Sequence, residues 1–428
     1  MRAKAAESFG NPQHRLGRAG ANAYAPARMT DFSDIVRSDY YAKHGYPHEA
    51  WRQLRRETPV RRFELEDYDP FWAITRYGDL THVSRQPRLF LNGPRLGFSS
   101  RRFPVRPAEE FARSLLNMDP PEHGKYRGLV NRRFTPHALS FLREHVERLS
   151  AGIVADVAAR LVAAASETGK CDFVTDVAAR LPLAVILDLL GVPRDDWASV
   201  FDWTNQAIAP ADPEYRRGAT PIETADRARS ALFDYFARYV AERRSAPRDD
   251  LVSVLAESRI DGEPVSDFDI LSYCFLLAVA GNETTRNATS GGLLAFIEHP
   301  AELDRLRRDP GLLASAVDEI LRWTSPVIHF CRTAAADTDV GGQSIRRGDL
   351  LILFYPSANR DEDVFPEPFR FDVGRTPNEH LAFGIGEHFC LGANLARLEL
   401  AGPVERVRSP FVGGIKRMPV RFLSRPTI

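Results

Sequence analysis

Residues 383–392 read Phe383-Gly384-Ile385-Gly386-Glu387-His388-Phe389-Cys390-Leu391-Gly392. A cysteine, Cys390, lies among glycines that permit tight turns and close approach of the backbone. The next residues, 393–400, have the composition of a helix, so backbone N–H groups just after Cys390 are expected to point back at its sulfur. Because a helix N-terminus stabilises negative charge, this arrangement predicts a thiolate.

A thiolate in such a loop, beside aromatic side chains and a histidine, suits a flat apolar cofactor whose metal has an open coordination position. That cofactor is haem. The pattern FxxGxxxCxG followed by a helix resembles the haem-binding loop of cytochrome P450 monooxygenases, which hold their iron through a Cys thiolate. The resemblance implies that Cys390 is the metal ligand of haem b and that Phe383 and Gly392 contact the cofactor. If Cys390 stood alone, a structural cysteine beside a Gly-rich turn would be the alternative to a haem ligand. The whole pattern does not favour that alternative.

A second motif, Glu319-Ile320-Leu321-Arg322, lies in the helical run 312–323, where the i,i+3 spacing puts carboxylate and guanidinium on one face. Downstream, residues 365–375 resemble the meander segment of the same family. The resemblance implies a buried triad of Glu319, Arg322 and a third arginine, which locks the loop carrying Cys390. The third member is Arg375 or Arg370; the position four residues after Phe371 favours Arg375.

The motif Ala280-Gly281-Asn282-Glu283-Thr284-Thr285 closes an apolar run, 271–280, that is too short for a membrane span. Small residues such as Ala280 would let a long helix pass close to the haem. Thr284 can bond back to the carbonyl of Ala280 and loosen the helix locally. The motif resembles the family's acid–alcohol pair, which implies that Glu283 and Thr284 are catalytic and deliver the protons that O2 activation requires.

Haem propionates need cationic partners, and four residues match the family's positions for them. They are His123, Arg127, Arg332 and His388. Each could instead be an ordinary surface cation.

The composition fits a large globular enzyme. Hydrophobic residues make up 44% of 428 residues, and equal numbers of acidic and basic side chains give zero net charge, which does not suggest nucleic acid. The four cysteines show no paired spacing, which favours a reducing compartment. We find no signal peptide or membrane anchor and expect a soluble, cytoplasmic, monomeric bacterial enzyme. Basic residues at Arg132, Arg133 and Arg397 flank the expected thiolate side, where the family receives a ferredoxin reduced by its ferredoxin reductase.

The chain organisation predicts a mainly α fold with a small β lobe, the cytochrome P450 fold, with haem between a long central helix and the Cys390 loop. Residues 1–28 are predicted to be a disordered extension, with Met29 as a possible start, and 29–428 a single domain. We expect a helix over 41–57 and helices over most of 136–330. Prolines predict a connection at 209–220. Strands are expected at 60–65, 71–75, 327–333, 338–345 and 350–354.

The motifs are closest to actinobacterial P450s that hydroxylate sterols, terpenoids and methyl-branched lipids. An apolar small-molecule substrate is therefore expected above the haem. The candidate pocket residues are Phe98, Phe275, Val279, Ala280, Val327, Ile328, Phe411 and Val412, for which core packing is the alternative. Polyketide or other secondary-metabolite tailoring is an alternative function, as is a haem-binding protein without turnover.

The region after Cys390 departs from the family. The helix starting near Ala393 meets Gly402-Pro403, which should stop it near Ala401 after roughly nine residues. In the family this helix continues beneath the haem, whereas here the sequence passes almost directly to the strand-like segment 410–422. We expect an internal deletion that leaves the thiolate side less covered and lowers stability or haem retention.

Overall fold

The computed structural model describes residues 32–94, 97–98, 101, 113–164, 170–400 and 419–421. The predicted extension, residues 1–28 with Met29, lies outside the described residues, as do Phe411 and Val412. The description below concerns the unit that begins at Phe32.

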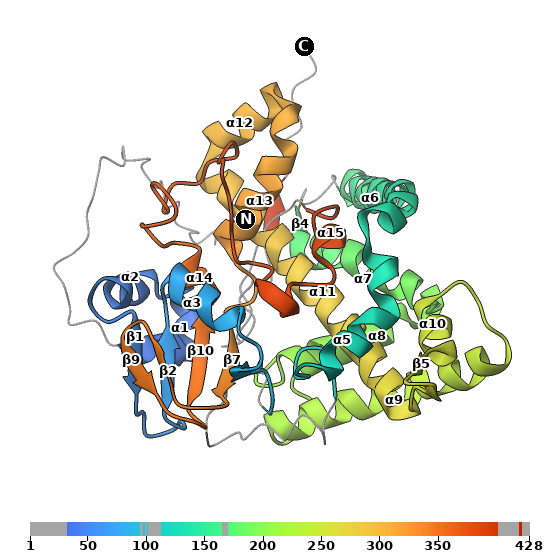
Figure 1. The fold of residues 1–428 in the computed structure, drawn as a ribbon. Helices are drawn as coiled ribbons and strands as arrows, with labels where there is room; N and C mark the ends of the chain where they lie inside the picture. Colours follow the sequence, from blue (N-terminus) through green and yellow to red (C-terminus); the bar gives the residue numbers. More distant parts are fainter. Residues whose placement is uncertain are drawn as a thin grey trace, which may run out of the picture. The chain divides into compact units, whose positions relative to one another are not determined.

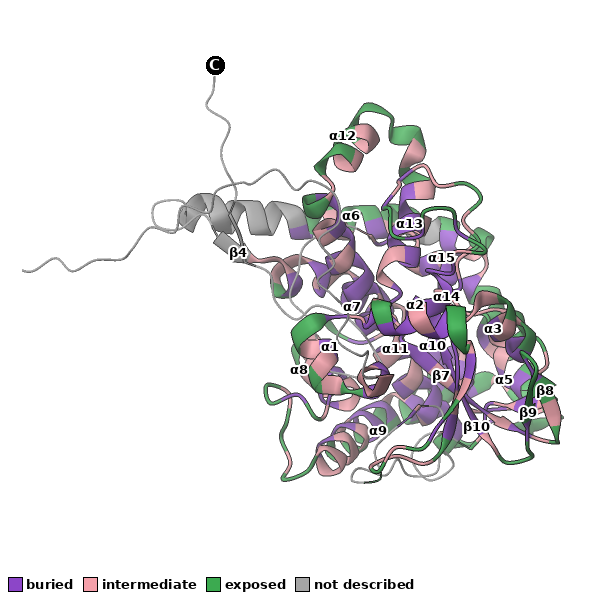
Figure 2. Ribbon diagram, turned by 90° about the vertical axis from the view of Figure 1, so that its left-hand side faces the viewer, coloured by how far each residue is buried: buried purple, intermediate pink, exposed green. Residues whose placement is uncertain are grey.

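A long helix, α11 (Asp267–Glu298), passes through the centre of this unit (Figure 1). Ser266 caps its start, because the Ser266 hydroxyl accepts a hydrogen bond from the Asp269 backbone N–H at 3.1 Å. Buried side chains lie on all sides of α11, and purple residues follow it through the interior in Figure 2. Across the described part of the chain, no helix combines the length and the apolar character needed to cross a membrane.

The other helices of the larger, helical part pack around or beside α11. They are α5 (Glu122–Val130), α6 (Pro136–Ala164), α7 (Arg180–Leu189), α8 (Trp197–Ile208), α9 (Pro221–Ser245), α10 (Leu251–Glu257), α12 (Pro300–Arg308) and α13 (Leu313–Thr324). The predicted connection at 209–220 is confirmed, since α8 ends at Ile208 and α9 begins at Pro221. Thr220 caps α9 by accepting a hydrogen bond from the Glu223 N–H at 3.1 Å.

The small β lobe contains a five-stranded sheet in the order β1-β2-β10-β7-β3. Its strands are β1 (Val60–Phe63), β2 (Phe71–Ile74), β3 (Phe90–Leu91), β7 (His329–Ala334) and β10 (Leu350–Phe354). β10 runs parallel to β2 and antiparallel to β7, so N-terminal and late segments lie side by side (Figure 1). All five residues of β10 are buried, which fits a central strand covered on both faces. The predicted fold class, mainly α with a small β lobe, is confirmed.

Short elements complete the described chain. Beside the main sheet lie α1 (Ser38–His44), α2 (His48–Glu57), α3 (Tyr77–Ser84) and α14 (Tyr355–Ala358). Two-stranded pairs are formed by β4 (Lys170–Asp172) with β11 (Pro419–Arg421), β5 (Arg259–Ile260) with β6 (Glu263–Pro264), and β8 (Thr338–Val340) with β9 (Gln343–Ile345).

Two predicted elements are divided in the structure. The helix expected over 41–57 is two helices, because Gly45 adopts a φ of 74° and Pro47 follows it. The strand expected over 338–345 is the hairpin β8–β9. Gly341 and Gly342 form its turn at φ 55° and 77°, a conformation that glycine adopts readily.

The helix after Cys390 is shorter than predicted. Helix α15 (Ala393–Ala396) is a single turn, after which the bonds tighten to the i→i+3 type at Leu398 (2.9 Å) and Glu399 (3.3 Å). The nearby Gly402-Pro403 leaves too few residues for a longer run of α-helical bonds to offset the cost of nucleation. Residues 401–418, where the deletion was predicted, lie outside the described residues.

The short α15 leads to a prediction about stability. A helical insert after Leu400, built from residues with high helix propensity and an apolar inner face, should raise the melting temperature by roughly 2 °C for each kcal/mol gained. Thermal unfolding of the haem-loaded protein would measure it. An insert of equal length made of Gly and Ser is the control. Equal melting temperatures for both inserts and the parent would show that the missing helix does not limit stability.

Candidate active site

The Cys390 loop, residues 383–392, is shaped by two glycines in the left-handed region. Gly384 and Gly386 have φ values of 68° and 80°. A Cβ on Gly386 would lie 2.8 Å from the Ser84 carbonyl oxygen, so a larger residue cannot fit there without displacing backbone. The Cys390 N–H closes the loop by donating to the Phe383 carbonyl at 2.9 Å. The sequence therefore holds the cysteine on a fixed turn.

The Cys390 thiol opens into a cavity although protein surrounds it. Burial raises its pKa above the ordinary value, and the Gly392 N–H, Arg127 and Arg397 oppose that shift. The prediction that Cys390 is a thiolate therefore stays a prediction, in which a bound metal takes part. α15 has only one turn, so its dipole is too weak to offset the loss of hydration. A bound metal would supply the missing stabilisation, because a coordinating thiol is deprotonated outright.

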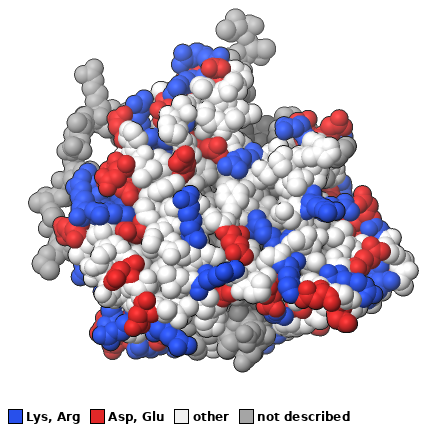
Figure 3. Space-filling model, viewed as in Figure 1, with Lys and Arg blue, Asp and Glu red and all other residues white. Residues whose placement is uncertain are grey.

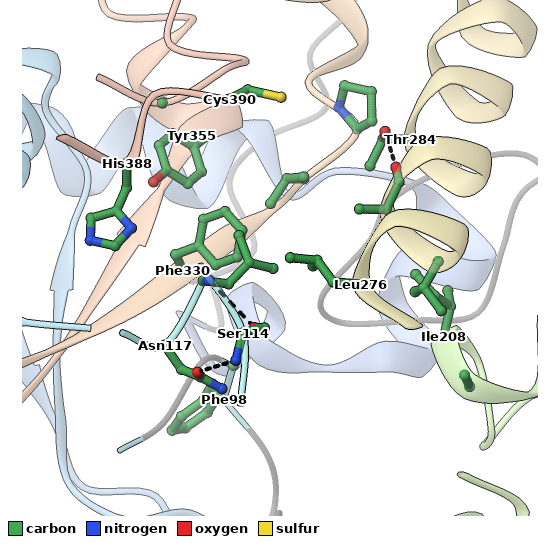
Figure 4. A pocket seen from close by; sticks show the side chains of 18 of the residues that line it. Phe98, Ser114, Asn117, Ile208, Leu276, Thr284, Phe330, Tyr355, His388 and Cys390 are labelled. Carbon is green, nitrogen blue, oxygen red and sulfur yellow. Dashed lines mark hydrogen bonds between the residues drawn. The ribbon is translucent and has the colours of Figure 1, made fainter. Parts of the chain in front are cut away.

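The cavity has a volume of about 1070 Å³ and lies between α11, the Cys390 loop and the β lobe. Figure 4 shows Cys390 and Thr284 approaching it from different sides, with Leu276, Phe330 and Ile208 along its length. Most sequence-predicted contacts are among its lining residues. These are Phe98, His123, Arg127, Phe275, Val279, Ala280, Thr284, Val327, Arg332, Phe383, His388, Cys390 and Gly392.

Two predicted residues do not line this cavity. Ile328 is fully buried in the apolar cluster that also contains Trp51 and Phe354, so for this residue the core-packing alternative is correct. It fails as a pocket residue because neighbours in an extended chain point to opposite sides, and Val327 takes the cavity side. Glu283 also lies outside the lining, on another side of α11 from Thr284.

The α11 motif has the predicted local bond. Thr284 donates its hydroxyl hydrogen to the Ala280 carbonyl at 2.9 Å (Figure 4). Such back-bonding weakens the helical ladder beside the cavity. Glu283 is buried and forms an ion pair with Arg286. Burial raises the pKa of Glu283, while Arg286 opposes the shift.

The four predicted propionate partners meet at one end of the cavity. The His123 and His388 ring centroids are 4.0 Å apart, and Arg127 and Arg332 lie in the same lining. His123 Nδ1 pairs with Glu387 Oε1 at 3.1 Å, whereas the Nε2 atoms of both histidines are buried without a partner among the described residues. Burial lowers both pKa values, that of His388 to about 3, where the neighbouring cations add to the effect. Glu387 is thus the carboxylate that pairs with this corner, while both histidine Nε2 atoms keep free hydrogen-bonding capacity among the described residues.

The structure brings Glu319, Arg322 and Arg375 together in a buried cluster. Glu319 Oε2 accepts from Arg322 Nε at 2.8 Å and from Arg375 Nε at 3.1 Å. The side chains of Glu319 and Arg322 are 0% exposed and that of Arg375 is 8% exposed. The Arg370 guanidinium instead pairs with Glu367 at the surface, and only the Arg370 carbonyl faces the cluster.

The surface predicted to receive a ferredoxin has less unpaired positive charge than the sequence suggested. Arg397 pairs with Asp318 at 2.8 Å and lies over the Phe383 ring, and Arg133 pairs with Asp249 at 2.8 Å. On the face shown in Figure 3, basic and acidic side chains are intermixed, in line with the zero net charge.

Sequence reasoning missed three residues at the site. Arg286 donates to Glu283 and also to Asn205, and its bond to Asn205 joins α11 to α8 across 81 positions of sequence. Glu399 lines the cavity beside Thr285, and burial raises its pKa to about 8. Its carboxyl group is therefore neutral at lower pH, which is compatible with an apolar cavity. Composition gave no signal for these contacts, because each depends on tertiary packing.

The comparisons with known proteins identify the family. The sequence profile of the cytochrome P450 family matches residues 311–404. Cytochrome P450-terp from a Pseudomonas species is 38% identical over 424 aligned residues, covering 91% of this chain and 96% of that protein. The chain is a cytochrome P450. This P450 is therefore a haem-thiolate monooxygenase, and its predicted fold and family are confirmed.

Further relatives and structures agree with this assignment. A steroid C26-monooxygenase from Rhodococcus jostii is 36% identical, covering 96% of this chain and 89% of that protein, and a methyl-branched lipid omega-hydroxylase from Mycobacterium tuberculosis is 37% identical, covering 87% and 90%. A Mycobacterium marinum cytochrome P450, CYP268A2, in complex with pseudoionone has a TM-score of 0.82 at 34% identity, covering 94% of this chain and all of that one.

The residues around the cavity fit the haem that the family implies. The Cys390 sulfur opens into the cavity, and His123, His388, Arg127 and Arg332 line one end of it. The Nε2 atoms of both histidines are buried without a partner among the described residues. A macrocycle with an apolar body and two carboxylates at one edge matches this distribution.

Proposed function

We propose that this P450 hydroxylates an extended, largely hydrocarbon substrate, with sterols, terpenoids and methyl-branched lipids as the favoured classes. The apolar cavity that reaches from Ile208 and Leu276 to Thr284 and Cys390 carries the proposal. The names of the relatives support it, since they include a steroid and a methyl-branched lipid hydroxylase. Electrons would come from a ferredoxin and its reductase, and the enzyme would act as a cytoplasmic monomer.

In this proposal Cys390 would bind the iron of haem b through its sulfur. His123, Arg127, Arg332 and His388 would hold the propionates, and Ala280, Phe383 and Gly392 would contact the ring. When bound, the haem supplies the chemistry that reduces dioxygen and inserts one oxygen atom into a C–H bond. The side chains of Phe98, Phe275, Val279 and Val327 would orient the substrate and exclude water.

Glu283 and Thr284 would manage protons in this reaction. The Thr284 hydroxyl faces the cavity and can exchange its bond to Ala280 for one to a guest in the cavity. Glu283, its neighbour on α11, would resupply the proton. The Thr284 alcohol would then face the substrate cavity, and the Glu283 acid would stand behind it as the source of the proton.

Replacing Thr284 with alanine should uncouple electron use from product formation. Substrate and haem should still bind, whereas the ratio of product to peroxide should fall by about 10²-fold, the order expected for one acid–base group. Peroxide and product measured per NADH consumed would test this. Thr289→Ala, a buried threonine on α11 outside the cavity, is the control. Equal coupling in both variants would remove Thr284 from the mechanism.

Substrate class is tested by binding spectra of the haem-loaded protein. Sterols, terpenoids and branched fatty acids should displace water from the haem and shift its spin state, because the cavity offers mainly apolar contacts. A panel of glycosylated macrolides provides the contrast. A spin shift with the macrolides alone would reject the lipid class and support polyketide tailoring, while binding without any product would support a haem protein without turnover.

A further inference from the structure

A polar cluster next to the Cys390 loop lies outside the cavity lining. Asp318 of α13 accepts hydrogen bonds from Arg397 Nε at 2.8 Å and from His380 Nε2 at 3.3 Å. His380 Nδ1 accepts the Ala382 N–H at 3.3 Å, so Nε2 carries the ring hydrogen that Asp318 receives. The cluster therefore joins α13 to the segment before the loop, through His380, and to the segment after it, through Arg397.

Arg397 also contacts the loop through the ring of Phe383. The Arg397 Cζ atom lies 4.8 Å from the centre of that ring, a distance at which a cation and an aromatic face attract each other. Phe383 lines the cavity, and its carbonyl accepts the Cys390 N–H at 2.9 Å. One aromatic side chain therefore links the guanidinium to the wall of the space proposed for the haem.

Side-chain contacts hold Arg397 where a longer helix would otherwise do so. α15 ends at Ala396, and its single turn leaves Arg397 as the residue that follows the last helical position. The Asp318 carboxylate and the Phe383 ring fix the guanidinium instead. The side chains of Arg397 and Asp318 are 36% and 33% exposed, so solvent screens their charges only in part.

This geometry gives the loop a fixed positive charge that is not bonded to the thiolate. Reduction of a haem iron adds one negative charge to its site, and a nearby cation favours the reduced form. Charged groups outside the ligands are one means by which proteins set the reduction potential of a metal. Asp318 has the opposite effect, because it adds a negative charge to the same cluster.

We propose that Arg397 is a positioning residue of the Cys390 loop, and that its cation, held by Asp318 against Phe383, raises the reduction potential of the bound haem. The inference rests on the proposed binding of haem iron by Cys390. The step concerned is the transfer of one electron from the proposed ferredoxin to ferric iron, with no bond to carbon or oxygen formed or broken. Arg397 would thus make that electron easier to accept.

Potentiometric titration of the haem-loaded, substrate-free protein tests this role. Arg397→Gln should shift the ferric–ferrous equilibrium roughly 3- to 10-fold toward ferric iron, which is about 30 to 60 mV at about 59 mV for each tenfold. Arg397→Lys keeps the charge and should stay closer to the parent than to Arg397→Gln. Asp318→Asn keeps an oxygen that accepts from Arg397 but loses the negative charge, so its potential should rise above that of the parent.

Arg244→Gln is the matched control. Arg244 is also 36% exposed and pairs with a carboxylate, that of Asp267, at 2.6 Å, but it does not contact the Cys390 loop. Its variant should keep the potential of the parent. The same potential in Arg397→Gln and Arg244→Gln would overturn the proposal. A fall in both Arg397→Gln and Asp318→Asn would also overturn it, because a loosened loop would then explain the data better than charge.

The carbon monoxide spectrum separates this inference from the proposed function on which it rests. Every variant should keep the red-shifted Soret band of the reduced parent, since Cys390 is unchanged in all of them. A parent without that band would reject Cys390 as the iron ligand. A parent with the band, and with a potential that Arg397→Gln leaves unaltered, would reject only the role of Arg397.

Discussion

Reduced Cys390→Ala protein treated with carbon monoxide is expected to lack the red-shifted Soret band of thiolate-ligated haem. A methyl group cannot coordinate iron, and no other described cysteine lies in the cavity lining, since Cys274 and Cys331 are buried elsewhere. The variant should also lose monooxygenase turnover completely. The cationic corner at His123, Arg127, Arg332 and His388 should still retain some haem, so the test compares spectra of loaded protein.

Cys274→Ala is the control, because it removes a buried cysteine of α11 that does not line the cavity. It should keep the band of the parent. A Cys390→Ala spectrum indistinguishable from that of Cys274→Ala would show that another residue supplies the thiolate.

Arg375→Ala should destabilise the protein by about 3–5 kcal/mol, the usual loss when one partner of a buried ion pair is removed. Arg375 shares Glu319 Oε2 with Arg322 and donates to the carbonyls of Pro366 and Arg370, both at 2.8 Å. Removing it takes one donor from each of these acceptors, and Glu319 Oε2 and the Arg370 carbonyl keep only their bonds from Arg322 and Asn378 among the described residues. Denaturant unfolding and the rate of haem release would measure the loss.

Arg370→Ala is the matched control for this cluster. Its side chain is 55% exposed and its ion pair among the described residues is with Glu367, so the expected change is below about 1 kcal/mol. A larger loss in Arg370→Ala than in Arg375→Ala would mean that the wrong arginine had been assigned to the triad.

The triad is connected to the Cys390 loop by a short path. Asn378 donates to Glu319 Oε2 at 3.2 Å, and the Leu381 N–H donates to Asn359 Oδ1 at 2.7 Å, two residues before the loop begins. These bonds fix the approach to residues 383–392. We therefore expect Arg375→Ala to release haem faster even under conditions where it stays folded.

Much of the fold could be predicted because local signals agreed with tertiary structure. Prolines at 210, 213 and 221 marked the α8–α9 connection, and the apolar run 271–280 lies within α11. The predicted element boundaries were wrong where a single glycine turns the chain. Gly45 and Gly341 divide elements that composition alone joins, and the length of α15 depends on tertiary contacts that helix propensity does not describe.

The candidate site was predicted where spacing along the chain determines position. The Cys390 loop and the Glu319–Arg322 pair are local motifs. The environment of Glu283 was not predictable, because Asn205 approaches it from another helix. The surroundings of the Cys390 thiol, which raise its pKa in the absence of a metal, were also not predictable, because they depend on the folded structure.

Oxygen-isotope labelling tests the central claim most directly. The haem-loaded enzyme would be supplied with a spin-shifting apolar substrate, a ferredoxin, its reductase, NADH and ¹⁸O₂ in ordinary water. A monooxygenase with these residues should give a hydroxylated product carrying one ¹⁸O atom, and the Cys390→Ala variant should give none. Product oxygen that comes from water, or electron use without any oxygenated product for every substrate that binds, would contradict the account.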